Sequence, residues 1–494
     1  MTFNSFHFYL FFPLVVVVHY LLPKRWRWMW LLIASYVFYG LSDIRFVLVL
    51  VACTLISYLA GRMIARQEDR TKRKRWQMVG TGLIVLILIV FKYMNFALGS
   101  VSMVLAAAGL QWQWRGVELL FPVGISFYTL QVISYLLDVG SGKVRAEKNL
   151  LQYTLFVSFF PQLLIGPIER FGQLRPQLTN PQPFSWERLR DGLARIGWGL
   201  FKKFVIADRL AMVANTVFAA PETFPSSKLM IAVVAFAFQV YLDFAAYTDI
   251  AIGAAGILGI TLTENFDRPY FARSVVDFWR HWHISLSNWL RDYVFLKLNY
   301  KHRRKKPRQL WTGLDVMATF LISGLWHGAN WTFVVWGLLH GIYQTLELLT
   351  QKGRDKLTVR LEINRERWMI KTWQRLITFL LVGFAWIFFK AASLNQATNI
   401  VRAIFTLDGI SKTGAWTLLD GSMGLDKLDM LMMVGTLVVY MVIEWLQGTH
   451  DLLAIFKRQP IWVRWIAYYA LLGSIIVFGF YGEASVVDFV YFQF

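Results

Sequence analysis

Among the eight histidines of this chain, His327 has the most unusual surroundings, because it lies in the middle of a long apolar stretch. The stretch runs from about residue 314 to 350, which is too long for one membrane span and fits two spans with a break. Gly324, Gly328 and Asn330 weaken helix at that break. An ionisable side chain at membrane depth indicates a functional site, and histidine exchanges protons near neutral pH. We therefore predict a role in proton transfer for His327.

A second histidine, His283, lies in the segment 277–293, where polar residues interrupt an apolar stretch. If the segment is one helix, Arg280, His283 and Ser287 share a face at positions i, i+3 and i+7. Such a polar face suits the wall of an internal cavity, and it equally suits an amphipathic helix in the membrane interface. His281 and His283 would lie on opposite sides of that helix, and no nearby Cys or Glu completes a ligand set. No metal site is therefore expected.

The remaining histidines have simpler interpretations. His7 and His19 lie in the first apolar run, and His302 and His450 lie in loops, so interfacial or solvated side chains are expected there. His340 lies in a helical run of apolar residues and is predicted to be a packing residue.

The apolar run 229–258 carries two carboxylates, which are costly in a membrane and must face protein or water. Gln239, Asp243 and Tyr247 recur every four residues and share a helix face, whereas Asp249 lies about 120° around the helix from Asp243. These four residues predict a structural polar network, with a proton path as the alternative. No G-x-S-x-G motif is present, so covalent serine catalysis is not expected.

A basic cluster follows the His283 segment directly. It is interpreted as an orientation signal in contact with lipid headgroups, or as a surface that attracts a phosphorylated donor or an acidic carrier protein. Its members are Lys301, Arg303, Arg304, Lys305, Lys306 and Arg308.

The composition indicates the setting in which these residues act. Of 494 residues, 56% are hydrophobic and 16% are charged, against about 45–50% and about 25% in soluble domains. The net charge of +21 lies mostly in short loops between apolar runs, which argues against a nucleic-acid partner. The single cysteine, Cys53, excludes an intrachain disulfide and a cysteine-based zinc site. The first apolar run has no charged leading region and is expected to be a membrane span rather than a signal peptide.

Twelve apolar runs are candidate membrane spans. They cover approximately 8–22, 29–42, 45–60, 78–97, 117–137, 197–216, 229–258, 314–325, 331–350, 370–389, 429–446 and 462–482.

Charge sets the expected topology. Basic loops such as 61–77 and 268–308 are expected in the cytoplasm, and the less basic loop 390–427 outside, with both termini outside. The stretches 151–166 and 275–296 must then enter and leave on the cytoplasmic side. Both contain breaks or charges that only protein or water tolerates at membrane depth, so we expect a cavity open to the cytoplasm. The absence of an internal repeat disfavours an inverted-repeat transporter.

At these motifs the sequence resembles the membrane-bound O-acyltransferase (MBOAT) family, in particular its bacterial branch involved in alginate O-acetylation. The segments that carry the resemblance are FPVGISFYTLQ at 121–131, FPQLLIGP at 160–167, QVYLDFAAYTDIAIG at 239–253, ENFDRPY at 264–270, DFWRHWHISLSNWLRDY at 277–293, SGLWHGANW at 323–331, WIFFKA at 386–391 and YFQF at 491–494. The resemblance implies a single all-α integral-membrane domain over 1–494, with about 11–13 membrane helices and re-entrant segments around a central tunnel. The motif-bearing region would be 121–350, and 390–428 an extracytoplasmic loop.

The resemblance also implies an activity: an acyl group moves from a cytoplasmic thioester to a hydroxyl on the far side of the membrane. The family's buried catalytic histidine maps onto His327 and its second prominent histidine onto His283, whereas His281 stands where relatives usually carry arginine. No bound cofactor is expected, since acetyl-CoA or an acyl carrier protein thioester is the donor substrate. Contacts to that donor are expected from Asn330, Ser287, Arg280, Trp326, Lys305 and Arg304.

The expected location is a bacterial inner membrane. The expected partners are membrane lipid, the acyl donor, a polysaccharide acceptor and periplasmic O-acetyltransferase or polysaccharide-modification proteins. Two other classes stay open: a transporter of donor or polymer that uses Asp243 and Asp249 as coupling sites, and a non-catalytic scaffold of an export complex.

Overall fold

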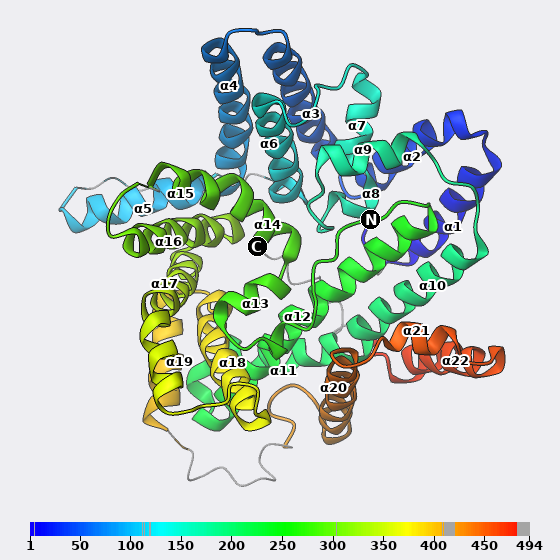
Figure 1. Ribbon diagram of the computed structural model, residues 1–494. Helices are drawn as coiled ribbons and strands as arrows, with labels where there is room; N and C mark the ends of the chain where they lie inside the picture. Colours follow the sequence, from blue (N-terminus) through cyan, green and yellow to red (C-terminus); the bar gives the residue numbers. More distant parts are fainter. Residues whose placement is uncertain are drawn as a thin grey trace. The chain divides into compact units, whose positions relative to one another are not determined.

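Regular structure in the described part of the chain is entirely helical (Figure 1). The computed structural model describes all residues except 4, 111, 113, 118–119, 303, 408, 410–419 and 482–494. Arg303 of the basic cluster, residues 408 and 410–419 of the predicted loop 390–428 and the motif at 491–494 therefore lie outside the described residues. The all-α class predicted from the sequence is confirmed.

The helices group into two compact units built from interleaved segments of the chain. The first unit comprises Met1–Ile196 and Thr248–Glu264, and the second comprises Gly197–Tyr247 and Asn265–Phe494. Two helices contribute residues to both units, namely α10 (Trp186–Phe201) and α12 (Ser226–Ile257).

The first unit contains nine further helices and one π-helical segment among its described residues. These are α1 (Phe6–Leu21), α2 (Lys24–Gly40), α3 (Ile44–Ala65), α4 (Arg70–Leu88), η1 (Ile89–Tyr93), α5 (Met94–Ala107), α6 (Ile125–Ser141), α7 (Leu150–Ser158), α8 (Phe160–Leu163) and α9 (Phe171–Thr179). In this unit α3, α4 and α6 pack side by side (Figure 1).

The described residues of the second unit contain the histidine motifs. Its remaining elements are η2 (Lys202–Ala207), α11 (Asp208–Ala219), η3 (Pro221–Thr223), η4 (Pro269–Phe271), α13 (Val275–His281), α14 (Ile284–Leu290), η5 (Arg291–Phe295), α15 (Leu296–His302), α16 (Arg308–His327), α17 (Trp331–Arg360), α18 (Trp368–Lys390), α19 (Leu394–Thr406), α20 (Lys427–Gln447), α21 (Leu452–Lys457) and α22 (Ile461–Phe478).

Six helical stretches among the described residues are long and apolar enough to cross a membrane, so the chain is a multi-pass membrane protein. They are Ile44–Ala65, Arg70–Ala107, Ser226–Ile257, Trp368–Lys390, Lys427–Gln447 and Ile461–Phe478, with Phe6–Leu21 as a shorter apolar helix. The other expected spans fall on helices that are shorter or more polar. The run 197–216, for instance, is helical but carries Lys202, Lys203, Asp208 and Arg209.

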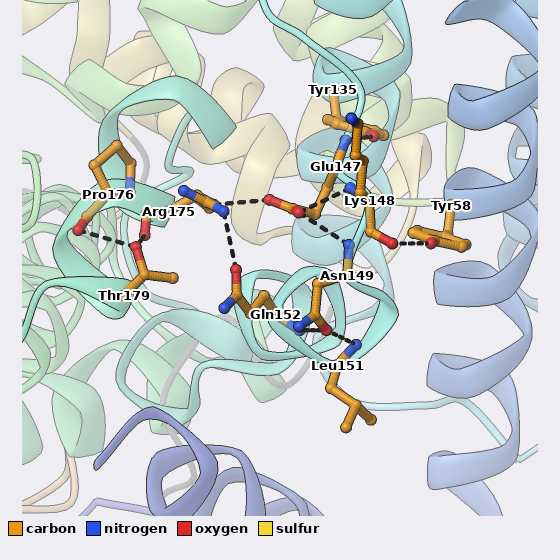
Figure 2. Close-up of polar contacts among 10 residues, drawn as sticks. All are labelled: Tyr58, Tyr135, Glu147, Lys148, Asn149, Leu151, Gln152, Arg175, Pro176 and Thr179. Carbon is orange, nitrogen blue, oxygen red and sulfur yellow. Dashed lines mark hydrogen bonds and ion pairs between the residues drawn. The ribbon is translucent and has the colours of Figure 1, made fainter. Parts of the chain in front are cut away.

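In the first unit, a buried carboxylate ties the loop before α7 to α9 (Figure 2). Glu147 accepts hydrogen bonds from the backbone N–H groups of Lys148 and Asn149, and Arg175 of α9 donates to it at 2.7 Å. Arg175 also donates to the Gln152 side chain on α7. Since each charged group here is paired, the cluster is a structural clamp.

In the second unit, α16 and α17 form the hairpin that carries His327, and glycines allow them to approach closely (Figure 1). A Cβ on Gly324 would lie 2.3 Å from the Phe333 carbonyl oxygen, and one on Gly337 would lie 2.3 Å from the Phe320 carbonyl oxygen. No real Cβ contact is that short, so both positions require glycine at this helix spacing.

We predict that Gly324→Ala lowers the free energy of unfolding by about 1–3 kcal/mol, because the new methyl group forces the two helix backbones apart. Thermal unfolding of the purified protein in detergent measures this effect. Gly353→Ala is the matched control, since Gly353 lies in the same helix pair with no neighbour within 4 Å and alanine favours helix there. Equal stability of Gly324→Ala and the wild type would contradict the proposed close packing.

Candidate active site

His327 is the last residue of α16 and is buried, with 4% of its surface exposed. Aromatic rings enclose it on three sides. The ring centroids of Trp326, Trp336 and Phe389 lie 4.9, 4.9 and 5.3 Å from the centroid of the imidazole. These rings come from α16, α17 and α18, so three helices meet at the histidine.

The chain breaks directly after His327, as the glycines predicted, and α17 begins at Trp331. A Cβ on Gly328 would lie 2.1 Å from the Phe333 ring, so this position has no room for a side chain. Asn330 caps α17: its side-chain oxygen accepts from the Thr332 N–H at 3.1 Å, and its amide donates to the Ala392 carbonyl at 2.9 Å. Asn330 thus fixes the start of α17 relative to the end of α18.

His283 lies at a second break, between α13 and α14, with φ at +42° and none of its surface exposed. The continuous helix that would align Arg280, His283 and Ser287 is therefore wrong. Arg280 is exposed, and the Ser287 hydroxyl donates to the Trp282 carbonyl at 3.0 Å. The left-handed backbone is strained for a non-glycine residue, which is typical of functional positions.

Hydrogen bonds from the segment 264–270 stabilise this break between α13 and α14. Asn265 accepts the Ile284 N–H at its carbonyl and the Ser285 N–H at its side-chain oxygen, and the Asp267 N–H donates to the His281 carbonyl. The backbone groups freed by the break are thereby paired, as burial requires. The ENFDRPY motif therefore acts as the partner of the histidine motif, a pairing that helical periodicity does not predict.

The second unit brings the two predicted catalytic histidines to the same aromatic ring. The Trp326 centroid lies 6.1 Å from that of His283 and 4.9 Å from that of His327. Phe244 of α12 packs edge-on against His283 at 4.7 Å. Two buried imidazoles flanking one indole form an apolar site with few polar groups, which suits proton transfer away from water.

The basic cluster, unlike the aromatic enclosure, has exposed side chains at Arg304 and Lys305. The Lys305 ammonium lies 4.2 Å from the centroid of the Trp311 ring. His302 bonds to the buried Asp315 at 2.7 Å, so it is anchored rather than freely solvated.

The carboxylates of α12 have separate partners. In the second unit, Asp243 accepts from Lys203 at 2.8 Å, and Lys203 also lies 2.9 Å from Asp208. In the first unit, Arg195 pairs with Asp249 at 2.9 Å and also with Glu264. Both carboxylates thus belong to ion pairs.

The two other members of the predicted network are also buried. Gln239 keeps its side-chain oxygen without a hydrogen-bond partner among the described residues, and Tyr247 is completely enclosed.

Sequence reasoning missed Lys203, the buried partner of Asp243, and Asp208, which pairs with the same lysine. Lys203 lies in the π-helical segment η2, and Lys92, which donates to the Ser126 hydroxyl, lies in η1. The charged pairs within the apolar run 197–216 were the available signal, since such charges must find partners inside the protein.

A metal centre has no support among the described residues, where no group of three or more His, Cys, Asp or Glu side chains is placed to hold an ion.

The loop after α17 contains a surface ion-pair cluster. Hydrogen bonds from Lys371 and Arg273 lower the pKa of Glu366.

Comparison with known proteins identifies the family of this chain. The chain belongs to the membrane-bound O-acyltransferase (MBOAT) family, whose pattern it matches over residues 31–390. It is therefore an O-acyltransferase of the membrane.

Three relatives represent the similarity. The probable alginate O-acetylase AlgI of Azotobacter vinelandii is 36% identical over 445 residues, covering 90% of this chain and 84% of that protein. The peptidoglycan O-acetyltransferase of Helicobacter pylori is 32% identical over 79% of this chain and 75% of its own length. The teichoic acid D-alanyltransferase of Bacillus subtilis is 29% identical over 47% of this chain and 60% of its own length.

We predict that Lys203→Met lowers the free energy of unfolding by about 3–5 kcal/mol, because it leaves two buried carboxylates without their cation. Unfolding in detergent measures this loss. The triple variant Lys203→Met, Asp208→Asn, Asp243→Asn should recover much of it, since no buried charge is left unpaired.

Arg45→Met serves as the control for that prediction. It removes an ion pair with Asp43 in which the arginine side chain is 68% exposed, and stability should not change measurably. If Lys203→Met is as stable as the wild type, the buried carboxylates of Asp208 and Asp243 do not need the lysine cation.

Proposed function

We propose that this O-acyltransferase moves an acetyl group from a cytoplasmic thioester across the membrane to a hydroxyl of an exopolysaccharide or cell-wall glycan. The observation that carries the proposal is the pair of buried histidines, His283 and His327, that both contact the Trp326 ring. The relatives named for alginate, peptidoglycan and teichoic acid support a glycan acceptor. Transfer is direct or passes through a periplasmic partner.

The proposed reaction uses His327 as general base. It takes the proton from the acceptor hydroxyl, or from the first acceptor of a relay, as that oxygen attacks the thioester carbonyl carbon. The C–O bond forms, the C–S bond breaks, and the proton passes from His327 to the departing thiolate. General-base catalysis of this kind contributes about 10²–10⁴-fold to the rate.

In this proposal His283 orients the donor, because its ring lies against the same indole as His327. Trp326 forms the apolar wall between the two imidazoles. Asn330 acts mainly by fixing the break after His327, and Ser287 by bracing the turn at Trp282. The exposed side chains of Arg280, Arg304 and Lys305 are free of the enclosure and suit attraction of donor phosphates or an acidic carrier protein.

The donor is acetyl-CoA or an acyl carrier protein thioester, and no resident cofactor takes part in the proposed reaction. The setting is a bacterial inner membrane with both chain termini outside the cytoplasm. Periplasmic modification proteins receive the acetyl group where transfer is indirect.

We predict that His327→Ala reduces thiol release from an acetyl thioester by about 10²–10⁴-fold without loss of folded protein. A thiol-reactive dye follows the reaction of purified protein in detergent. His450→Ala, which changes an exposed histidine, should keep full activity. Normal thiol release by His327→Ala would refute the assignment, and no release by the wild type would favour a transporter.

The acceptor is tested in cells. Mass spectrometry of surface polysaccharides should show loss of O-acetyl groups from one polymer when this protein is absent, and their return with the wild type but not with His327→Ala. Unchanged acetylation of all surface glycans would contradict a glycan acceptor.

A further inference from the structure

Three N–H groups near His327 are fully enclosed, yet they lack a hydrogen-bond partner within the described part of the chain. They are the indole Nε1–H groups of Trp336 and Trp386 and the Nε2 of His340, all in residues with 0% of their surface exposed. Buried indole N–H groups usually find a partner, and an unpaired one is costly. Three together in one cluster therefore call for a ligand that accepts hydrogen bonds.

The protonation of His340 follows from its neighbour. The Trp279 Nε1–H donates to the His340 Nδ1 at 3.1 Å, so Nδ1 carries no proton. A neutral imidazole then carries its single proton on Nε2, which makes Nε2 a donor. Trp279 thus holds His340 in the tautomer whose Nε2–H is buried without a partner among the described residues.

Trp336 contacts the predicted base directly, and Trp386 and His340 both contact Trp336. The Trp336 ring lies between two imidazoles, with its centroid 4.9 Å from that of His327 and 5.0 Å from that of His340. Trp386 stacks on Trp336 at 5.8 Å with the two indole planes only 22° apart. Phe389 closes the other side of His327 at 5.3 Å and offers no donor.

We propose that Trp336, Trp386 and His340 form a donor group that binds the carbonyl oxygen of the acyl thioester beside His327. This inference rests on the proposed function and adds the residues that stabilise its transition state. As the acceptor oxygen bonds to the carbonyl carbon, the carbonyl electron pair moves onto the carbonyl oxygen. The three N–H groups stabilise that negative charge until the C–S bond breaks and the carbonyl re-forms.

The choice of side chains supports an electrostatic role rather than packing alone. Phenylalanine provides an aromatic packing surface without a buried polar atom, and the chain uses it at Phe389 in the same enclosure. Preorganised donors in a site without water stabilise a developing charge far more than they stabilise a neutral ground state. The group therefore acts on the rate constant more than on donor binding.

The test compares Trp336→Phe and Trp386→Phe with the wild type in the thiol-release assay on the full-length protein. Each substitution should lower kcat by about 10²–10³-fold, while KM for acetyl-CoA changes only a few-fold. Each substitution also removes buried ring volume and lowers the melting temperature, so kcat is measured well below that temperature, where the variants are fully folded.

Trp30→Phe is the matched control, since its indole N–H donates to the Val15 carbonyl at 3.0 Å in the first unit. This variant should melt at a lower temperature and keep its kcat. The control therefore separates loss of a structural hydrogen bond from loss of a catalytic donor.

His340 gives a rescue test. His340→Gln keeps an N–H close to the position of Nε2, whereas His340→Phe removes it, so the glutamine variant should retain at least about tenfold more activity. If kcat is unchanged in Trp336→Phe, Trp386→Phe and His340→Phe while His327→Ala is inactive, the donor group is overturned and the proposed function still stands. If kcat falls only in proportion to the loss of folded protein, and His340→Gln is no more active than His340→Phe, the three side chains have a packing role. That result also overturns the donor group. An inactive wild type overturns the proposed function itself.

Discussion

Hydrocarbon offers no hydrogen bonds, so a histidine that transfers protons inside a membrane must be shielded from lipid by protein or face a water-filled cavity. His327 meets this requirement through rings from three helices, namely Trp326, Trp336 and Phe389. The enclosure in turn constrains the second unit. The hairpin of α16 and α17 must be tight, which Gly324 and Gly337 allow, and α18 must present Phe389 to the histidine.

The same constraint explains the buried charges. Lys203 lies between Asp208 and Asp243, and Arg195 lies between Asp249 and Glu264, so each cation in these clusters neutralises nearby carboxylates. Breaking such a pair is costly, so each ion pair anchors the part of α12 that lies in its own unit. Phe244, one residue after Asp243, packs against His283, so the ion pair and the histidine are supported by the same turn of helix.

Much of the site was predictable from residue types. The apolar runs predicted an all-α membrane protein, and the glycines around His327 predicted the break that follows it. The break at His283 was not predictable from periodicity, because it depends on pairing with Asn265 and Asp267 of the preceding segment. Lys203, the partner of Asp243, was not predicted for a similar reason, because helical spacing within one span does not indicate which residue of another helix lies next to it. His340 was predicted to be a packing residue, and only the hydrogen bond from Trp279 indicates a defined tautomer.

The central claim is that acyl transfer takes place at His327, and a structure with a non-hydrolysable thioether analogue of the acetyl donor tests it most directly. We expect density for the analogue inside the aromatic enclosure, with the acyl-mimicking group within hydrogen-bond reach of the His327 ring, about 3 Å. An analogue that inhibits thiol release but binds away from Trp326, Trp336 and Phe389 would contradict the claim.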